Sequence, residues 1–456
     1  MSITAHSIGM TGWKAGISKR LSAYRTLPFL ACAAGLLVFV EMIYLIVTAQ
    51  LGSMGGLEMA DIAERIVLGY GFSSPYIPAG EGGPTSVSPP LYVWLMSGVY
   101  MLLGIKSEWS NTVLQIFNIL FNVVTLIFLY RVCAAKFSEL TARIFAILFA
   151  LHPHILLISG SIWETGLSLM LLSCILWFVS LKFSHQSLTH CVLLGLLFGV
   201  TALSNPAWTL CYPIICIVLI WPRSINRRNF TKSVVALSTI FVSYLCIVSP
   251  WLIRNYATTG ELMYVRNMAG PELFKGNHDY AGGGHGLGFQ NYWIYKSQAE
   301  QTHYKNMGEK DYDQWMKQQA LEYITNHPKH YTALVISRIG MWWSGDFDVL
   351  KKWHNVGDQR KFAFGVVLTI AGLVTSIFTL WGTWQLRSNT RQLWLIWIYI
   401  YFLPIPYYLI IIGFRYQSSL MAFALIPSAY CLSVLVDKLH AQAPNTRQLI
   451  SHDHTA

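Results

Sequence analysis

Long apolar runs alternate with short polar segments along the whole chain. A run of about 18 or more apolar residues is long enough to cross the hydrocarbon core of a bilayer as a helix. The predicted fold class is therefore an all-α polytopic membrane protein with about ten transmembrane helices. These helices are expected at about residues 27–49, 112–131, 141–158, 165–182, 189–205, 207–221, 233–252, 363–385, 393–412 and 418–436.

Residues 89–104 form a further apolar segment that is short for a membrane span. The loop after it, 105–111, has one Lys and one Glu, whereas the loop around 131–143 is more basic. Cytoplasmic loops carry the excess of Lys and Arg, so the second loop is the better cytoplasmic one. We therefore predict that 89–104 lies at the outer interface without crossing. If it crosses, the number of spans becomes eleven.

Basic residues also orient the chain. Residues 1–26 and the loop 222–232 each contain four Lys or Arg and no acid, which places both in the cytoplasm. The predicted order is a cytoplasmic N-terminal segment (1–26), an N-terminal transmembrane region (27–252) with its first outer loop at 50–111, an outer or periplasmic segment (253–361), C-terminal transmembrane helices (362–437) and a cytoplasmic tail (438–456). Within the outer segment, a helical pattern breaks at Pro328.

The composition limits the classes of partner. Of 456 residues, 54% are hydrophobic and only 12% are charged. The net charge of +11 sits mostly in short loops between apolar runs, so we predict no nucleic-acid binding. The eight cysteines lie in or beside apolar segments without metal-type spacing, so we predict no disulfide framework.

The most informative polar stretch is 54–104. It begins with three acids on one short predicted helix: Glu58, Asp61 and Glu64. It continues through Gly- and Pro-rich turns and reaches Pro89-Pro90 ahead of an aromatic helix. An acidic loop rich in turn formers and held against a membrane is typical of a functional site. An acidic amphipathic helix lying on the membrane is the alternative.

This stretch resembles a known family. The pattern of an acid, then A-x-x-(I/L)-x-x-G-x-G-F and P-P-L-Y, is similar to the first outer loop of the GT-C integral-membrane glycosyltransferases. That superfamily includes the protein O-mannosyltransferases and the lipid A aminoarabinose transferases. The matching residues here are Glu58, Ala63, Gly69, Gly71, Phe72, Pro89, Pro90, Leu91 and Tyr92.

Further segments carry the same resemblance. They are W-E-T around Glu164, P-W-x-x-R-N around Arg254, E-L-x-x-G-N at 272–277 and F-R-Y around Arg415. The resemblance covers roughly residues 27–430. It implies a GT-C-like helical bundle with juxtamembrane helices in the outer loop.

Glycosyl transfer to a hydroxyl needs a base for the acceptor proton and a cationic group for the leaving phosphate. The resemblance makes Glu58 the first candidate base. Asp61 lies on the same helix face, so the choice between the two stays open. Family members often carry an acid where this chain has Gly55 and Gly56. Glu164 is the second predicted catalytic acid, and a favourable interaction with a helix dipole is the alternative explanation for it.

The predicted ligands of the donor phosphate are Arg254, Arg415 and Lys275. Arg254 and Arg415 stand at the outer ends of predicted spans, at the height of lipid phosphates. Ordinary snorkelling of interfacial Arg is the alternative. Arg266 and Arg338 are further cationic candidates. The resemblance also makes Tyr92 and Asn277 candidate substrate-binding residues.

No protein-held metal site is predicted from spacing. His152 and His154 stand near the acids, but residues at i and i+2 do not share a helix face. A divalent cation, Mg²⁺ or Mn²⁺, shared by the acids stays open as a cofactor. The D-x-D pairs at 311–313 and 346–348 are weak evidence for a nucleotide-sugar site. They fall in the outer segment, where nucleotide sugars are absent.

The resemblance implies an inverting glycosyltransferase of the plasma (inner) membrane, with its site on the outer face. The donor would be a polyprenyl-phosphate-linked sugar, and the acceptor a hydroxyl on a lipid, glycan or protein. The alternative is a transporter or flippase of a lipid-linked sugar, which could use similar residues. The sequence shows no repeat between its halves, which disfavours a transporter.

Overall fold

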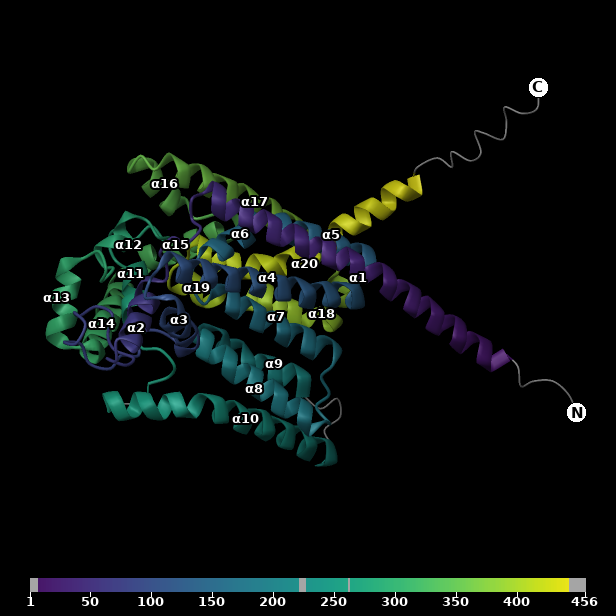
Figure 1. Ribbon diagram of the computed structural model, residues 1–456, viewed down its shortest axis with the longest axis horizontal. Helices are drawn as coiled ribbons and strands as arrows, with labels where there is room; N and C mark the ends of the chain where they lie inside the picture. Colours follow the sequence, from purple (N-terminus) through teal and green to yellow (C-terminus); the bar gives the residue numbers. More distant parts are fainter. Residues whose placement is uncertain (1–6, 221–226, 261–262, 443–456) are drawn as a thin grey trace, which may run out of the picture.

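The computed structural model describes residues 7–220, 227–260 and 263–442 (Figure 1). Within these ranges the chain is helical, and its β-structure consists of one isolated bridge between Ser73 and Pro84. The bundle runs lengthwise in Figure 1. The start of α1 and the end of α20 lie at one end, and α2 and α11–α14 lie at the other.

The N-terminal half contains the first long helix, the outer-loop helices and the first apolar bundle. These are α1 (Ser7–Val47), α2 (Leu57–Val67), α3 (Pro90–Leu103), α4 (Glu108–Lys136), α5 (Glu139–Leu151), α6 (Pro153–Gly160), α7 (Thr165–Leu181), α8 (Leu188–Ser204), η1 (Pro206–Cys211), α9 (Tyr212–Ile220) and α10 (Arg227–Thr259).

The C-terminal half contains the outer segment and the last apolar helices. These are α11 (Ala269–Gly276), α12 (Leu287–Asn291), α13 (Gln298–Met307), α14 (Glu309–Asn326), α15 (Pro328–Ser344), α16 (Phe347–Asn355), α17 (Gln359–Gln385), η2 (Arg387–Asn389), α18 (Thr390–Trp397), η3 (Ile398–Phe402), α19 (Ile405–Leu409) and α20 (Phe414–Gln442).

Five described helices are long and apolar enough to cross a bilayer, and the number is six if the bent pair α5–α6 is one span. The chain is therefore an integral membrane protein, but the predicted number of ten spans is not confirmed. Several predicted spans correspond to shorter apolar helices: α7, α8, the η1–α9 pair and the α18–α19 region. Prolines explain two of the breaks. Pro153 follows the 51° bend between α5 and α6, and Pro404 interrupts residues 393–409.

The segment predicted to lie at the interface forms α3, which has 14 residues. At a rise of about 1.5 Å per residue this helix is about 21 Å long, which is shorter than the roughly 30 Å hydrocarbon core. Its length is consistent with an interfacial position, which stays a prediction. Helix α3 packs on α2 through Met59, Ile62, Tyr92 and Met96.

Helices α8 and α10 pack closely because of two glycines four residues apart. A Cβ atom at Gly195 would lie 2.3 Å from the carbonyl oxygen of Ile240, and one at Gly199 would lie 2.5 Å from the Cβ of Ile247. Small residues at this spacing let helix backbones approach within a membrane. The contact holds α10 against α8, and the predicted outer segment follows α10.

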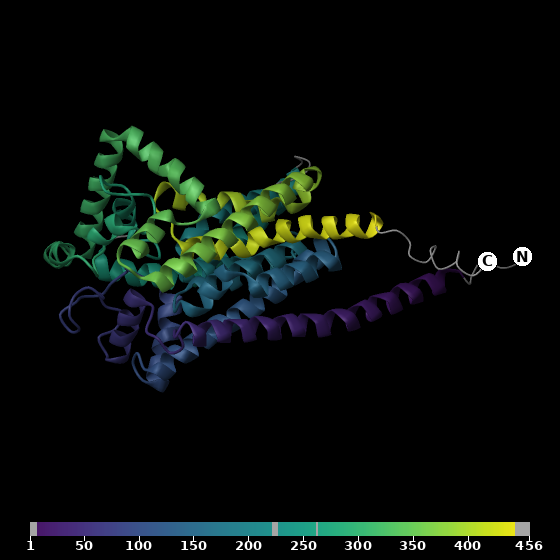
Figure 2. The ribbon, with the colours of Figure 1, turned by 90° about the horizontal axis from the view of Figure 1, so that it is seen from above.

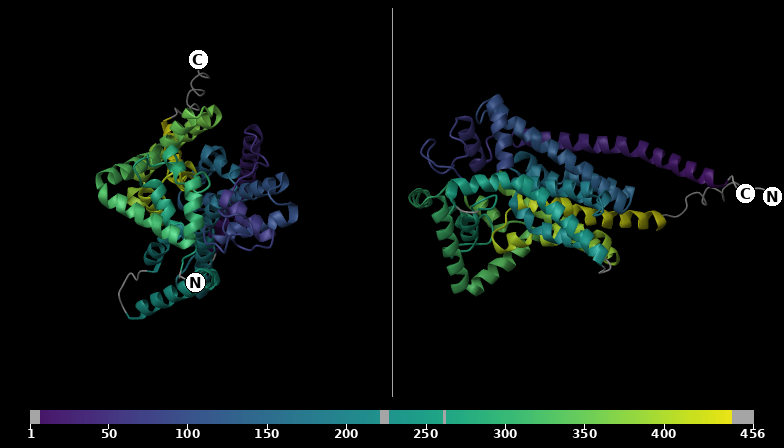
Figure 3. Two further views of the ribbon diagram at one scale, coloured as in Figure 1. Left: turned by 90° about the vertical axis from the view of Figure 1, so that its left-hand side faces the viewer. Right: turned by 90° about the horizontal axis from the view of Figure 1, so that it is seen from below.

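The segment predicted to lie outside forms α11–α16 at the end of the bundle opposite to the start of α1 (Figures 2 and 3). Helix α14 ends at Asn326 and α15 begins at Pro328, so the predicted break is confirmed. Proline is well suited to the first position of a helix, because its missing N–H would have no intrahelical partner there. Tyr304, Tyr312 and Met316 bury this segment against Val87 of the first outer loop.

Candidate active site

Two glycines bring the first outer loop against the start of α7. Gly56 has φ +81°, and a Cβ atom there would lie 2.9 Å from the carbonyl oxygen of Ile162. A Cβ atom at Gly55 would lie 3.2 Å from the Cβ of Ile162. Of the two positions where family members often carry an acid, Gly56 has a left-handed backbone and no space for a side chain, and Gly55 is tightly packed. The close approach places Glu58, at the start of α2, near Glu164, just before α7.

One cavity of about 150 Å³ joins three of the predicted site residues: Glu58, Glu164 and Arg415. Its walls come from α2, the Ser88-Pro89 turn, the residues before α7 and η1, the outer segment and the junction of α19 with α20. The other lining residues include Trp163, Asn205, Arg266, Glu272, Tyr407 and Tyr416. Three carboxylates, those of Glu58, Glu164 and Glu272, and two guanidinium groups therefore line one small space.

Glu58 meets two neutral donors. The hydroxyl of Tyr76 lies 3.5 Å from its Oε1, and the indole nitrogen of Trp293 lies 3.4 Å from the same atom. Both contacts are long for hydrogen bonds. Burial, followed by the Glu58 charge, raises the pKa of Tyr76 well above its usual value, so this hydroxyl stays protonated. Within the described ranges no Lys or Arg forms an ion pair with Glu58.

Glu164 is buried, with 7% of its surface exposed. Its Oε1 accepts a 3.4 Å hydrogen bond from the amide of Asn205, while its Oε2 is buried without a described partner. Its side chain makes no capping bond to α7, although the residue occupies the N-cap position. An unpaired buried oxygen is costly, so this atom is suited to a group that enters the cavity.

The two arginines of the cavity are held in different ways. The guanidinium of Arg415 lies 4.1 Å from the ring of Trp163, and it donates a 3.2 Å hydrogen bond to the hydroxyl of Tyr416. Arg266 donates to the carbonyl of Val87 at 2.7 Å and pairs with Glu272 at 3.1 Å. The Arg266 side chain keeps 35% of its surface exposed because it borders the cavity.

Lys275 lies outside the cavity and pairs with Glu272, the acid that also binds Arg266. Its ammonium lies 3.2 Å from Glu272 and 5.0 Å from the ring centre of Phe289. Burial alone would raise the pKa of Glu272, but Lys275 and then Arg266 outweigh it and lower this pKa to about 2. Glu272 therefore stays ionised at neutral pH and partly neutralises both cations. Lys275, a predicted phosphate ligand, does not line the cavity.

Asp61 faces away from the cavity. Its carboxylate pairs with Lys106, which also pairs with Glu64, and it accepts a hydrogen bond from the hydroxyl of Tyr295. Burial alone would lower the pKa of Lys106, but the two acids raise it. Asp61 is therefore bound to a cation and does not line the cavity, whereas Glu58 does.

Arg254, another predicted phosphate ligand, is engaged by the first outer loop. Its guanidinium donates to the carbonyls of Thr85 and Phe72 at 2.6 and 2.8 Å, and it lies 4.8 Å from the ring centre of Trp251. It does not line the cavity. Arg266, a further cationic candidate from the sequence, lines the cavity instead.

The two predicted substrate-binding residues are buried outside the cavity. Tyr92 donates a 3.3 Å hydrogen bond to Asn118 and packs between α2, α3 and α4. Asn277 accepts from Arg338 at 3.0 Å and donates to the carbonyl of Leu273. Neither residue lines the cavity. Asn205 is not among the site residues predicted from the sequence. It caps η1, and its side-chain amide also reaches Glu164.

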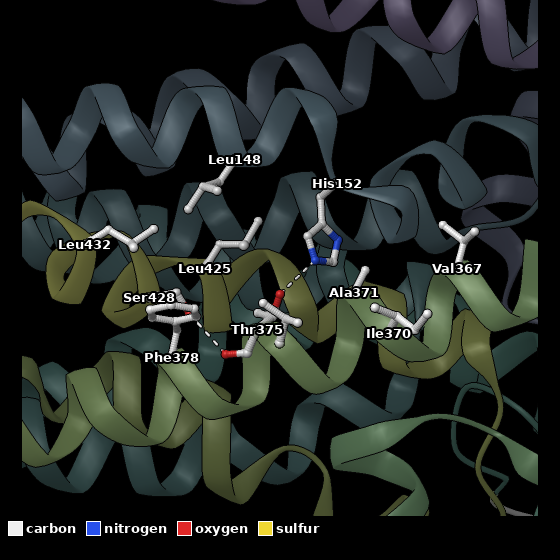
Figure 4. A pocket seen from close by; sticks show the side chains of 11 residues that line it. Leu148, His152, Val367, Ile370, Ala371, Thr375, Phe378, Leu425, Ser428 and Leu432 are labelled. Carbon is white, nitrogen blue, oxygen red and sulfur yellow. Dashed lines mark hydrogen bonds between the residues drawn. The ribbon is translucent and has the colours of Figure 1, made fainter.

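His152 and His154 lie between α6, α17 and α20, away from the two acids. His152 bonds the hydroxyl of Thr375 at 2.9 Å beside an apolar pocket of about 380 Å³ (Figure 4). His154 bonds Ser418 at 2.8 Å. In the described parts of the chain, no three His, Cys, Asp or Glu side chains converge to hold a metal ion. The cavity has three carboxylates beside two guanidinium groups, and Glu272 is already paired with Arg266 and Lys275. This donor set does not fit a divalent cation held by protein ligands alone.

Comparison with known proteins gives matches of two kinds. Residues 87–253 match a family model described as dolichyl-phosphate-mannose-protein mannosyltransferase. No protein with a curated description matches the chain. Among solved structures, the oligosaccharyltransferase AglB of Archaeoglobus fulgidus, in complex with an inhibitory peptide and a dolichol-phosphate, matches with a TM-score of 0.55 at 15% identity.

The AglB match covers 95% of this chain and 52% of AglB, so this chain spans about half the length of that enzyme. A second Archaeoglobus fulgidus oligosaccharyltransferase structure, with Zn and sulfate, gives a TM-score of 0.52 over 94% of this chain and 51% of that one, at 15% identity. ArnT of Cupriavidus metallidurans bound to undecaprenyl phosphate is 11% identical, with a TM-score of 0.39 over 87% of this chain and 76% of ArnT. The fold of this chain is that of the GT-C integral-membrane glycosyltransferases.

Proposed function

We propose that this protein is a glycosyltransferase that moves a sugar from a polyprenyl-phosphate carrier to an acceptor hydroxyl. The observation that carries the proposal is the single cavity that joins Glu58 and Glu164 to Arg266 and Arg415. Transfer of this kind needs a carboxylate and a phosphate-binding cation within reach of one substrate. The family model over residues 87–253 and the dolichol-phosphate in the AglB structure support the same donor class.

In the proposed reaction Glu58 takes the proton of the acceptor hydroxyl. The acceptor oxygen forms a new bond to the anomeric carbon, while the bond from that carbon to the phosphate oxygen breaks. One displacement inverts the configuration. The polyprenyl phosphate leaves with the electron pair, and its added negative charge lies beside Arg415 and Arg266. Arginine suits this role because its planar donors match phosphate oxygens.

Glu164 is proposed to orient the reacting groups. Its unpartnered Oε2 can accept a hydrogen bond from a sugar or acceptor hydroxyl, while Asn205 holds its Oε1. Its negative charge also stabilises the positive charge that develops on the sugar ring. We place the site on the outer face of the plasma membrane, because α2 and α11, which line the cavity, lie at the end of the bundle opposite to the basic start of α1.

The test is transfer of labelled sugar from polyprenyl-phosphate donors by membranes that contain the protein. We expect Glu58→Gln to lower kcat by about 10²- to 10⁴-fold, the range for loss of a general base. Asp61→Asn is the matched control and should retain transfer. Normal transfer by Glu58→Gln would remove Glu58 as the base. Movement of intact donor across the vesicle membrane, without transfer to any acceptor, would support the alternative function, a transporter of lipid-linked sugar.

A further inference from the structure

A second pocket lies on the outer side of the molecule, between residues 279–289 and α16. Its volume is about 300 Å³, at the small end of the range for ligand sites. It is lined by the backbone of Gly282, Gly284, Gly286 and Gly288 and by polar and aromatic side chains. The proposed transfer reaction does not use it.

The shape of this pocket depends on its glycines. A Cβ atom at Gly282 would lie 2.1 Å from Oδ2 of Asp348, and one at Gly284 would lie 2.1 Å from Oδ1 of Asp346. The same acids hold the loop, because Asp348 accepts from the amide of Gly284 at 2.9 Å and Asp346 from that of His285 at 3.1 Å. Glycine therefore allows the carboxylates to reach the backbone while the other side of the loop stays open.

The polar groups of the pocket balance in charge. Asp279 of the loop and Asp348, Lys351, Lys352 and Asn355 of α16 line it, so two carboxylates stand with two ammonium groups and one amide. A site for a phosphate or another anion would carry an excess of cations. Balanced donors and acceptors suit a neutral ligand with many hydroxyl groups.

Two aromatic rings complete the pocket. Tyr280 is 73% exposed, so one face of its ring is open to a ligand, and Phe289 lines the inner wall. Sugars present C–H faces that pack on aromatic rings, while their hydroxyls use surrounding carboxylates and amides. Aromatic rings together with balanced polar groups favour a saccharide as the ligand. A peptide would require a groove or a sheet edge.

The pocket lies one aromatic layer from the proposed base. The ring of Phe289 lies 5.8 Å from that of Trp293, whose indole nitrogen lies 3.4 Å from Glu58. On the other side of the loop, the ring of His285 lies 5.7 Å from that of Tyr416, which lines the catalytic cavity. A molecule bound in the outer pocket is therefore beside the active site.

We propose that the outer pocket binds a neutral saccharide unit of the acceptor. This unit is separate from the part of the acceptor that carries the hydroxyl reacting at Glu58. This inference rests on the proposed transferase function. It specifies the acceptor class, a glycan, and gives the Gly-rich loop the role of a shared wall between acceptor and donor sites.

The test measures binding without any donor lipid. Saturation-transfer NMR with methyl hexosides and with cellobiose and maltose is applied to the full-length protein in nanodiscs. We expect binding by the wild type and about tenfold weaker binding by Tyr280→Ala, the loss of one aromatic contact. Tyr70→Ala removes another half-exposed outer tyrosine, at 51% exposure, and should bind as the wild type does. Tyr280 is mostly exposed, so its removal should leave the fold intact.

The outcomes separate this inference from the transferase proposal. Glu58→Gln should keep glycoside binding while it loses transfer. No glycoside binding by the wild type, or equal binding by Tyr280→Ala, would overturn the acceptor pocket and leave the transfer result untouched. Displacement of bound glycoside by a short peptide, with peptide binding lost in Tyr280→Ala, would also overturn it, in favour of a protein acceptor.

Discussion

The guanidinium of Arg415 lies 4.1 Å from the ring of Trp163, the residue immediately before Glu164. The cation is thus held over an aromatic face beside a carboxylate, without an ion pair to that carboxylate among the described residues. A cation held this way keeps N–H groups for a ligand. The pair therefore gives the cavity a positioned phosphate-binding group.

Replacement of this arginine by lysine should weaken donor binding. Arg415→Lys keeps the charge but loses the flat stacking on Trp163 and the paired donors. We expect the KM for the polyprenyl-phosphate donor to rise about tenfold, with a smaller change in kcat. Initial rates over a range of donor concentrations provide the measurement. Trp163→Phe should retain more affinity than Trp163→Ala, and equal effects of the two would argue against stacking.

Asp61 and Lys106 should behave as a structural pair. Asp61→Asn and Lys106→Met each remove the ion pair, whose side chains are 25% and 24% exposed. Each substitution should lower stability by about 1 kcal/mol or less, with little effect on turnover. Thermal unfolding of the single and double variants in detergent forms a double-mutant cycle. Fully additive losses would show that the pair is not coupled, and loss of turnover in Asp61→Asn would reopen the choice of base.

Arg254 should act through the conformation of the first outer loop. Arg254→Ala removes two hydrogen bonds to loop carbonyls and leaves those acceptors without their donor. We expect faster proteolysis around residues 72–85 and a loss of stability of about 1–3 kcal/mol. Limited proteolysis followed by mass spectrometry locates the cleavage. If Arg254 instead held the donor phosphate, the donor KM would rise while the proteolysis pattern stayed unchanged.

The charge of Glu272 predicts how stability depends on pH. Its pKa is lowered from 4.5 to about 2 in the folded protein, so the ionised form stabilises the fold. This contribution is fully present above pH 4.5 and is lost as the pH falls towards 2. It amounts to roughly 3 kcal/mol at most, at about 1.4 kcal/mol per pKa unit. The difference in melting temperature between the wild type and Glu272→Gln should therefore shrink from pH 6 to pH 3. A constant difference would mean that Lys275 and Arg266 do not stabilise the charge.

Much of the fold could be predicted from the order of residues. Apolar run length alone identifies an integral membrane protein, and proline chemistry places the break between α14 and α15 at Pro328. The number of spans was harder to predict. Pro153 and Pro404 divide apolar stretches into shorter helices, and hydropathy does not distinguish a bent span from two separate segments.

The candidate site also combines features that the sequence predicts with features that only the tertiary structure decides. The sequence alone determined the chemical types: acids in the first outer loop and before α7, and arginines at the outer ends of apolar helices. Only the tertiary structure decided which of them meet. Glu58, Glu164 and Arg415 share a cavity, whereas Asp61 pairs with Lys106 and Arg254 holds loop carbonyls. The physical reason is that periodicity reports which face of one helix is buried, while a site depends on contacts between segments far apart in the chain, such as Gly56 against Ile162.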